Sequence, residues 1–274
     1  MHPVTLESLA SSIPDGALLA LPPDNSLSPC ELGRAIVLAG KRNLRVLGVP
    51  VSGYVTDILI GAGSVAAVQS SGVSLGETGI APRFQAALAA GTIQMNDATC
   101  PAIHTMLQAA EKGVPFMPLR GIIGSDILAH RPDWRVIDNP FAPASDPIVM
   151  IPALAPDIAA FHAVMADPHG DVFVGRRQEL ATMAHAARRT LVTVERVVDA
   201  NLLEDERLAP GTIPATYIEA VAVTPRGAWP LALLDEYPAD PAHLSEYARL
   251  AKTEDGFRAY LDRFVFSRPA WAAE

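Results

Sequence analysis

Short apolar runs alternate along the chain with segments whose apolar residues recur at helical spacing. The run at 17–21 leads into the loop Pro22-Pro23-Asp24-Asn25-Ser26, and further runs lie at 44–49, 65–68 and 92–95. Strands that alternate with helices favour a parallel sheet with helices on its faces. We therefore predict an α/β fold with an open, mostly parallel, doubly wound sheet flanked by helices.

Local signals mark the ends of individual elements. Ser28-Pro29-Cys30-Glu31 is typical of a helix start, with Ser28 as the cap and Glu31 completing a capping box. Two prolines within 114–119 predict an edge strand or an extended segment, because proline has no N–H to give to a sheet. No internal repeat or linker divides the chain, so we expect a single domain over 1–274. Apolar runs continue at 148–151 and 158–164, and further strands are expected at 190–194 and 218–223. Helices are expected at 6–13, 57–61, 82–90, 103–111, 180–188, 243–251 and 257–266.

Composition and charge narrow the class of partner. Half of the residues are hydrophobic, 19% are charged, and the net charge is −9 with 21 scattered Lys and Arg. A sizeable core is therefore expected, whereas nucleic acid and a membrane surface are not expected partners. Cys30 and Cys100 form no metal-ligand spacing, so we expect no metal. The first 14 residues lack a signal-peptide pattern, which favours a cytoplasmic protein with reduced thiols.

Polar clusters follow the ends of two apolar runs. Asn25 and Ser26 follow the first predicted strand, and Gly124-Ser125-Asp126 follows the run at 114–119. In an open α/β sheet, ligands bind outside the carboxyl ends of the strands. We therefore predict that the two corners line one pocket. From the residues alone, Gly124-Ser125-Asp126 is better explained as a capped turn that opens a helix.

Three further residues have two interpretations each. Glu77 lies in a glycine-rich corner, where it either reaches a site or faces water at a subunit boundary. Arg120 either pairs with a carboxylate or phosphate or is solvated surface. Cys100 precedes His104 by four residues, which places both on one face of a helix. The thiol is then a nucleophile or, in the commoner case, an inert buried cysteine.

Several segments, taken in order, resemble the A subunit of family I CoA-transferases, especially the glutaconate CoA-transferase type. The most specific match is Gly113-Val114-Pro115-Phe116-Met117-Pro118-Leu119-Arg120 followed by Gly124-Ser125-Asp126. The other matching segments are at 77–84, 167–171, 193–198, 213–221 and 227–230. The resemblance covers almost the whole chain, and it reverses the preference at Gly124-Ser125-Asp126 in favour of a substrate-binding role.

The resemblance implies a division of labour between two chains. In this family a glutamate carboxylate attacks an acyl-CoA thioester, and the CoA then passes to an acceptor carboxylate. That glutamate normally lies in the B chain, in a Ser-Glu-Asn-Gly type motif that is missing here. The resemblance therefore implies no nucleophile in this chain, a B-type partner subunit, coenzyme A as a substrate and no tightly bound cofactor.

The sequence departs from the family pattern in the loop after the first strand. A Gly-rich oxyanion loop is usual there, but this chain has Pro22-Pro23-Asp24-Asn25-Ser26, and its two prolines have no N–H. Asn25 and Ser26 are therefore the expected donors. A related branch of ring-opening CoA-ester hydrolases has an acid at the position that Cys100 occupies here. The alternatives are a CoA-ester hydrolase and a non-catalytic acyl- or CoA-binding module.

Overall fold

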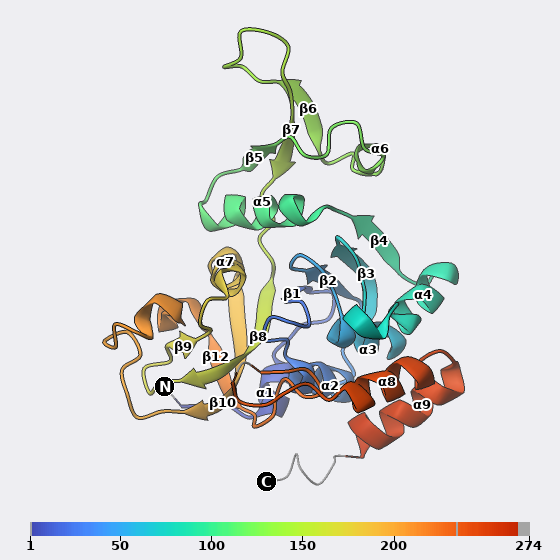
Figure 1. Cartoon of the computed structure of the whole chain (residues 1–274), viewed down its shortest axis with the longest axis vertical. Coiled ribbons are helices and arrows are strands. Elements are labelled where there is room, and N and C mark those ends of the chain that lie inside the picture. The colour runs from blue at the N-terminus through green and yellow to red at the C-terminus, as the bar shows by residue number, and fades with distance from the viewer. Residues whose placement is uncertain (1, 234, 268–274) are drawn as a thin grey trace.

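A large, mostly parallel sheet forms the centre of the molecule (Figure 1). The computed structural model describes residues 2–233 and 235–267. Within them the sheet runs in the order β11-β9-β8-β1-β2-β3-β4, and β10 pairs with β8 and with β12. The strands are β1 (Leu18–Leu21), β2 (Leu44–Gly48), β3 (Val65–Ser70), β4 (Gln94–Asp97), β8 (Ile158–Ala166), β9 (Val172–Phe173), β10 (Arg189–Val197), β11 (Thr212–Ile213) and β12 (Ala220–Val223).

The pairing of the strands confirms the predicted α/β class. β1 pairs in parallel with both β2 and β8, and the parallel pairing continues outward to β4 on one side and β12 on the other. β9 and β11 are antiparallel additions. All four residues of β1 are buried, as expected for a strand with helices on both faces of its sheet.

Helices cover both faces of this sheet and form two hydrophobic cores (Figure 1). One core gathers α1 (Leu6–Ser11), α2 (Cys30–Leu38), α3 (Tyr54–Gly61), α4 (Pro82–Ala89), α8 (Pro241–Leu250) and α9 (Glu254–Leu261). The other gathers α5 (Cys100–Glu111) and α7 (Gln178–Ala186). The short helical turns are η1 (Gly76–Thr78), η2 (Ala209–Gly211), η3 (Ala215–Tyr217) and η4 (Asp262–Phe266).

A second sheet, which the apolar pattern did not predict, projects beyond α5 (Figure 1). It is antiparallel, in the order β5-β7-β6, with β5 (Phe116–Leu119), β6 (Arg135–Asp138) and β7 (Pro147–Pro152). The short helix α6 (Ile127–His130) lies between β5 and β6 in the chain. The edge-strand prediction for 114–119 is confirmed, but that strand belongs to this small sheet and not to the parallel one.

The predicted cap of α2 is wrong. The helix begins at Cys30 with Pro29 at the cap position and no capping side chain, and Ser28 is buried. The chain enters the helix through Leu27 in a left-handed conformation (φ 59°), which carries Ser28 inward. Glu31 is paired with Arg34, and its amide donates to the carbonyl of Gly227 (2.9 Å).

Candidate functional site at the carboxyl edge of the parallel sheet

The loops that follow β2, β3 and β4 form one rim at the carboxyl edge of the sheet. The amide of Ser71 donates to the carbonyl of Pro50 (3.0 Å), and the amide of Ser52 donates to the carbonyl of Gly72 (2.9 Å). The amide of Ala98 donates to the carbonyl of Ser70 (3.3 Å). These hydrogen bonds connect the turns after β2, β3 and β4 to one another, so the three turns form one continuous surface.

The loop after β1 is held by the side chain of Asp24. Both carboxylate oxygens accept from the amide of Tyr54, at 2.9 and 3.0 Å, at the start of α3. The carboxylate lies so close to Gly53 that a Cβ there would be 2.2 Å from Oδ1 of Asp24. Burial raises the pKa of Asp24 to about 7, against the opposing hydrogen bond from Tyr54. The loop is therefore anchored through its third residue as well as stiffened by its prolines.

Asn25 and Ser26 have different surroundings within this loop. Asn25 is exposed, and its carbonyl accepts from Nη2 of Arg177 (3.0 Å). Ser26 is buried, and its hydroxyl is hydrogen-bonded to the carboxylate of Glu179. The amide side chain of Asn25 therefore remains available to a ligand, whereas the Ser26 hydroxyl is directed at Glu179.

A cavity of about 410 Å³ lies between this loop and the start of α7. Its lining combines Asn25 and Ser26 with Arg176, Arg177 and Glu179. Two guanidinium groups and one carboxylate give the lining one net positive charge. Sequence reasoning missed these three residues of the α7 region, although the adjacent arginines are a visible signal. In the chain α7 lies between β8 and β10. Because β8 pairs with β1 and also with β10, the α7 region comes to lie beside the loop that follows β1.

Cys100 opens α5 on the same rim, and its contacts do not suggest a thiol–imidazole pair. Thr99 caps the helix by accepting from the amide of Ala102 (3.3 Å). The thiol is exposed, so the interpretation of Cys100 as a buried cysteine is wrong. Its sulfur lies 3.1 Å from the hydroxyl oxygen of Ser71 in the neighbouring turn. Burial lowers the pKa of His104, an effect opposed by the charge of Glu179. Within the described residues, the Cys100 sulfur therefore contacts the hydroxyl group of Ser71.

Gly124, Ser125 and Asp126 lie in the connection between β5 and β6 of the small sheet. They form an exposed turn before α6, in which the Ser125 hydroxyl donates to the carbonyl of Ile122 (2.8 Å). Asp126 occupies the cap position of α6 without a capping side-chain bond. Their corner follows β5, which is antiparallel and outside the main sheet, so the premise of a shared carboxyl edge with Asn25 is wrong. None of the three lines the cavity beside Asn25.

Arg120 and Glu77 also lie away from that cavity. Arg120 forms an ion pair with Asp146 (Nη2 to Oδ2, 2.7 Å), and this contact lowers the pKa of the Asp146 carboxyl. Glu77 is exposed within η1. The ion pair gives Arg120 a structural partner on the small sheet, and the position of Glu77 fits its interpretation as a residue that faces water.

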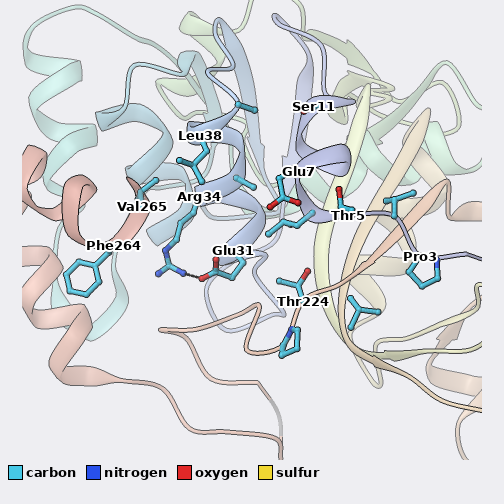
Figure 2. A pocket seen from close by; sticks show the side chains of 16 residues that line it. Pro3, Thr5, Glu7, Ser11, Glu31, Arg34, Leu38, Thr224, Phe264 and Val265 are labelled. Atoms are coloured by element: carbon cyan, nitrogen blue, oxygen red, sulfur yellow. Dashed lines mark hydrogen bonds and ion pairs between the residues drawn. The ribbon is translucent and has the colours of Figure 1, made fainter. Parts of the chain in front are cut away.

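A larger cavity, of about 630 Å³, lies between α1, α2, the end of β12 and residues 264–265 (Figure 2). Its lining includes none of the residues that the sequence predicted for the site. Most of the lining is apolar, and its polar centre is the ion pair of Glu31 with Arg34. We place the candidate reaction site at the carboxyl edge instead, because the loop after β1 and its polar cavity lie there and ligands of open α/β sheets bind at that edge.

The described residues offer neither a metal cluster nor a membrane span. They contain no group of three or more His, Cys, Asp or Glu side chains positioned to hold a metal ion. Across the same residues, no helix combines the length and the apolar character needed to cross a membrane.

Comparison with known proteins gives one consistent family. A family model described as Coenzyme A transferase matches residues 4–224. The chain is 32% identical over 228 residues to the A subunit of glutaconate CoA-transferase from Acidaminococcus fermentans, an alignment that covers 77% of this chain and 70% of that protein. The crystal structure of that glutaconate CoA-transferase superposes with a TM-score of 0.88 at 28% identity, covering 97% of this chain and 89% of the other.

Two further relatives are named for two different activities, one a CoA-transferase and the other a hydrolase. The A subunit of 3-oxoadipate CoA-transferase from Pseudomonas knackmussii is 26% identical over 269 residues, covering 94% of this chain and 91% of that protein. The cholesterol ring-cleaving hydrolase IpdA subunit of Rhodococcus jostii is 28% identical over 245 residues, covering 86% and 82%. Similar sequences therefore occur in both transferase and hydrolase subunits.

Proposed function

The chain belongs to the Coenzyme A transferase family, and on that premise we propose that it is the A-type subunit of a two-chain CoA-transferase. The proposed reaction moves CoA between an acyl-CoA and a small carboxylic acid. The observation that carries the proposal is the similarity to the glutaconate CoA-transferase A subunit, in sequence and in structure, over most of both chains. Both relatives named as transferases are A subunits, which supports a B-type partner here.

In this proposal the partner supplies the nucleophile and this chain supplies the binding surface. The partner's glutamate would attack the thioester carbonyl, and the carbonyl oxygen would become an oxyanion. The exposed amide of Asn25 is the side-chain donor that we assign to that oxyanion. Coenzyme A enters as a substrate, and we propose no tightly bound cofactor. We also propose a cytoplasmic location, in keeping with the free thiols of Cys30 and Cys100.

Arg176 and Arg177 add an anion-binding element to this surface. Guanidinium groups bind carboxylates and phosphates through paired N–H donors. Arg177 is already engaged with the carbonyl of Asn25, whereas the Arg176 side chain is exposed at the cavity. We assign to Arg176 the carboxylate of the acid substrate or a phosphate of CoA.

The role that we propose for Gly124, Ser125 and Asp126 is contact with the partner subunit. Their turn is exposed on the small sheet, which also carries a set of exposed apolar side chains. Those side chains are Phe116, Ile123, Val136, Ile137 and Phe141. Val136 and Ile137 are successive residues of β6 and point to opposite faces of the small sheet, so apolar surface is exposed on both faces, as is common at protein–protein contacts. We therefore propose that the small sheet meets the B-type subunit.

A CoA-ester hydrolase is the second candidate, because a hydrolase subunit is among the relatives. The branch that opens rings was expected to carry an acid at the position of Cys100. In this chain the residue is a cysteine that contacts Ser71, which favours the transferase.

The deciding experiment is co-expression with a candidate B chain that contains a Ser-Glu-Asn-Gly-like motif, followed by an acyl-CoA exchange assay. A transferase converts donor to new acyl-CoA one for one and releases little free CoA, whereas a hydrolase releases free CoA without an acceptor. A complex that assembles but neither exchanges nor hydrolyses would favour the third candidate, a non-catalytic binding module. The Pro22-Pro23 loop is compatible with that outcome.

A further inference from the structure

The start of α7 contacts the middle of the loop that follows β1. We infer that Arg177 and Glu179 are positioning residues, which hold the Asn25 side chain where the oxyanion of the reaction forms. The inference rests on the proposed function, because it assigns these two residues a role within the acyl-CoA reaction. Their contacts are with the loop itself, so we assign them no contact with the reacting atoms.

Groups outside α7 hold the two ends of this part of the loop. At one end the Asp24 carboxylate is bonded to the start of α3. At the other end the carbonyl of Leu27 accepts from the amide of His162 in β8 (2.8 Å). Asn25 and Ser26 lie between these two anchors, and their orientation depends on what holds them there.

Two side chains of opposite charge from α7 hold these two loop residues. Nη2 of Arg177, at the cap position of the helix, donates to the carbonyl of Asn25 (3.0 Å). Glu179, the second residue of the helix, accepts from the hydroxyl of Ser26. The peptide unit that joins Asn25 to Ser26 is thus held on both sides. A donor on a backbone fixed in this way is preorganised for a developing negative charge.

The opposite charges of the two residues also suit an oxyanion site. A carboxylate alone beside the reacting carbonyl would disfavour a developing oxyanion, and the guanidinium of Arg177 offsets the charge of Glu179. The net positive charge of the cavity lining is then that of Arg176. Because the Ser26 hydroxyl donates to Glu179, the Asn25 amide is the donor that the loop offers to the substrate.

The first test compares two changes at Glu179 in the complex with a B-type subunit. Glu179→Ala removes the acceptor of the Ser26 hydroxyl and should lower kcat about tenfold, while KM changes by less than about twofold. Glu179→Gln keeps a side-chain oxygen for that hydroxyl, so kcat should stay within about twofold of the wild type. Equal losses in the two variants would show that the charge matters and not the hydrogen bond, and would overturn the inference.

Gln178→Ala is the matched control on the same turn. Gln178 precedes Glu179, is exposed and does not line the cavity, so kcat and KM should both be unchanged. A loss as large as that of Glu179→Ala would show that any change at the start of α7 disturbs the loop, and would overturn the specific role of Glu179.

A cycle of variants with Asn25 tests whether the two residues act through that side chain. Arg177→Ala alone should lower kcat about tenfold, as Glu179→Ala does. Once Asn25→Ala has removed the donor, adding either change should slow the complex no further. Losses that multiply, so that each double variant is about tenfold slower than Asn25→Ala, would overturn the inference. That result would show that the residues support the fold or act independently of Asn25.

Turnover by the wild-type complex separates this inference from the proposed function. The variants are compared on the reaction that the complex performs, which is CoA exchange or hydrolysis of acyl-CoA. A wild-type complex that is active, with Arg177→Ala and Glu179→Ala equally active, would overturn the positioning role and leave the proposed function standing. A wild-type complex without turnover would overturn both.

Discussion

At the scale of single residues, Asn25 is the side chain on which the proposed chemistry depends most. Its amide is exposed beside the cavity, while the loop around it is fixed by Asp24 and by a turn in which the Ser26 amide donates to the carbonyl of Pro23 (2.9 Å). Loss of one oxyanion donor typically costs about 3 kcal/mol of transition-state stabilisation. We expect Asn25→Ala to slow CoA exchange by the complex about a hundredfold and to leave the Tm unchanged.

The control for this change is Asn201→Ala, outside the cavity lining, which should leave the exchange rate unchanged although it removes the side-chain hydrogen bonds of Asn201 with Leu203 and Glu204. The two variants are compared by kcat in the reconstituted complex and by thermal unfolding of the chain. A normal rate for Asn25→Ala would show that the loop after β1 is only a structural turn. A lowered Tm would instead show that the side chain supports the fold.

Cys100 is expected to be dispensable for the chemistry. Its sulfur lies 3.1 Å from the Ser71 hydroxyl, and that hydroxyl also donates to the carbonyl of Pro50 (2.9 Å). A serine at position 100 can keep the contact with Ser71. Cys100→Ser should therefore retain the exchange rate of the complex to within a few-fold. A loss of more than about a hundredfold with the fold intact would identify a thiol nucleophile.

Only part of the candidate site could be predicted from single residues. Asn25 stood out as a polar residue in the loop after the first strand, because strand ends are visible in the apolar pattern, and the structure exposes it beside a cavity. The partner of the Ser26 hydroxyl was not predictable, since Glu179 is 153 positions away. Arg176 and Arg177 were missed for the same reason: the contacts that bring the α7 region beside the first loop are non-local.

At the scale of elements, Asp24 makes the stability of the contact at the start of α3 dependent on pH. Burial raises the pKa of this carboxyl from 3.8 to about 7, so the folded chain retains a proton that the unfolded chain releases. Its contribution to stability is therefore fully present below about pH 4 and is lost as the pH rises to about 7. Burial also raises the pKa of Asp57, and the charge of Asp57 is the smallest of the causes that act on the pKa of Asp24.

Asp24→Asn removes this titrating carboxyl and keeps an oxygen that can accept from the amide of Tyr54. The free energy of unfolding of the variant, relative to the wild type, should rise by up to about 1.4 kcal/mol per pH unit between pH 4 and pH 7 and stay level above that. Chemical denaturation of both proteins across this range measures the difference. A difference that does not change with pH would mean that Asp24 titrates normally.

The elements themselves were predicted unevenly. The inner strands β1, β2 and β8 were found because they are apolar runs, and β5 was recognised as an edge strand from its prolines. β4 was placed two residues too early, because Gln94–Asp97 is mostly polar. β6 was missed because Arg135–Asp138 is exposed at every position and carries no alternation of buried and exposed residues. The prediction of the α2 cap was wrong because Leu27 has a left-handed backbone conformation and Ser28 is buried. No local sequence motif indicates this conformation.

At the scale of the whole molecule, β6 leaves the small sheet with an open apolar edge. It is an edge strand of the described sheet, and Val136 and Ile137 are 51% and 41% exposed on it. Phe141, in the connection to β7, is 94% exposed. An exposed apolar edge is prone to unwanted association unless another chain covers it. Coverage by the B-type subunit would explain why these side chains are apolar.

Asp substitutions at Val136 and Phe141 test this surface together with the dependence on a partner. Both side chains face solvent in the free chain, so its Tm should change little. In the complex a buried, unpaired carboxylate is costly, and we expect the double variant to lose both CoA exchange and co-purification with the B-type subunit. The wild-type chain alone should likewise show no exchange, because it lacks the nucleophilic glutamate motif.

Leu203→Asp is the matched control, since Leu203 is 42% exposed and lies outside the small sheet. It should preserve both assembly and exchange, as judged by size-exclusion chromatography and the acyl-CoA assay. If the double variant still assembles, the partner meets another face of this chain. If the lone wild-type chain exchanges CoA, the nucleophile is here and the division of labour between two chains is wrong. Assembly and catalysis are thus measured separately, and each can fail without the other.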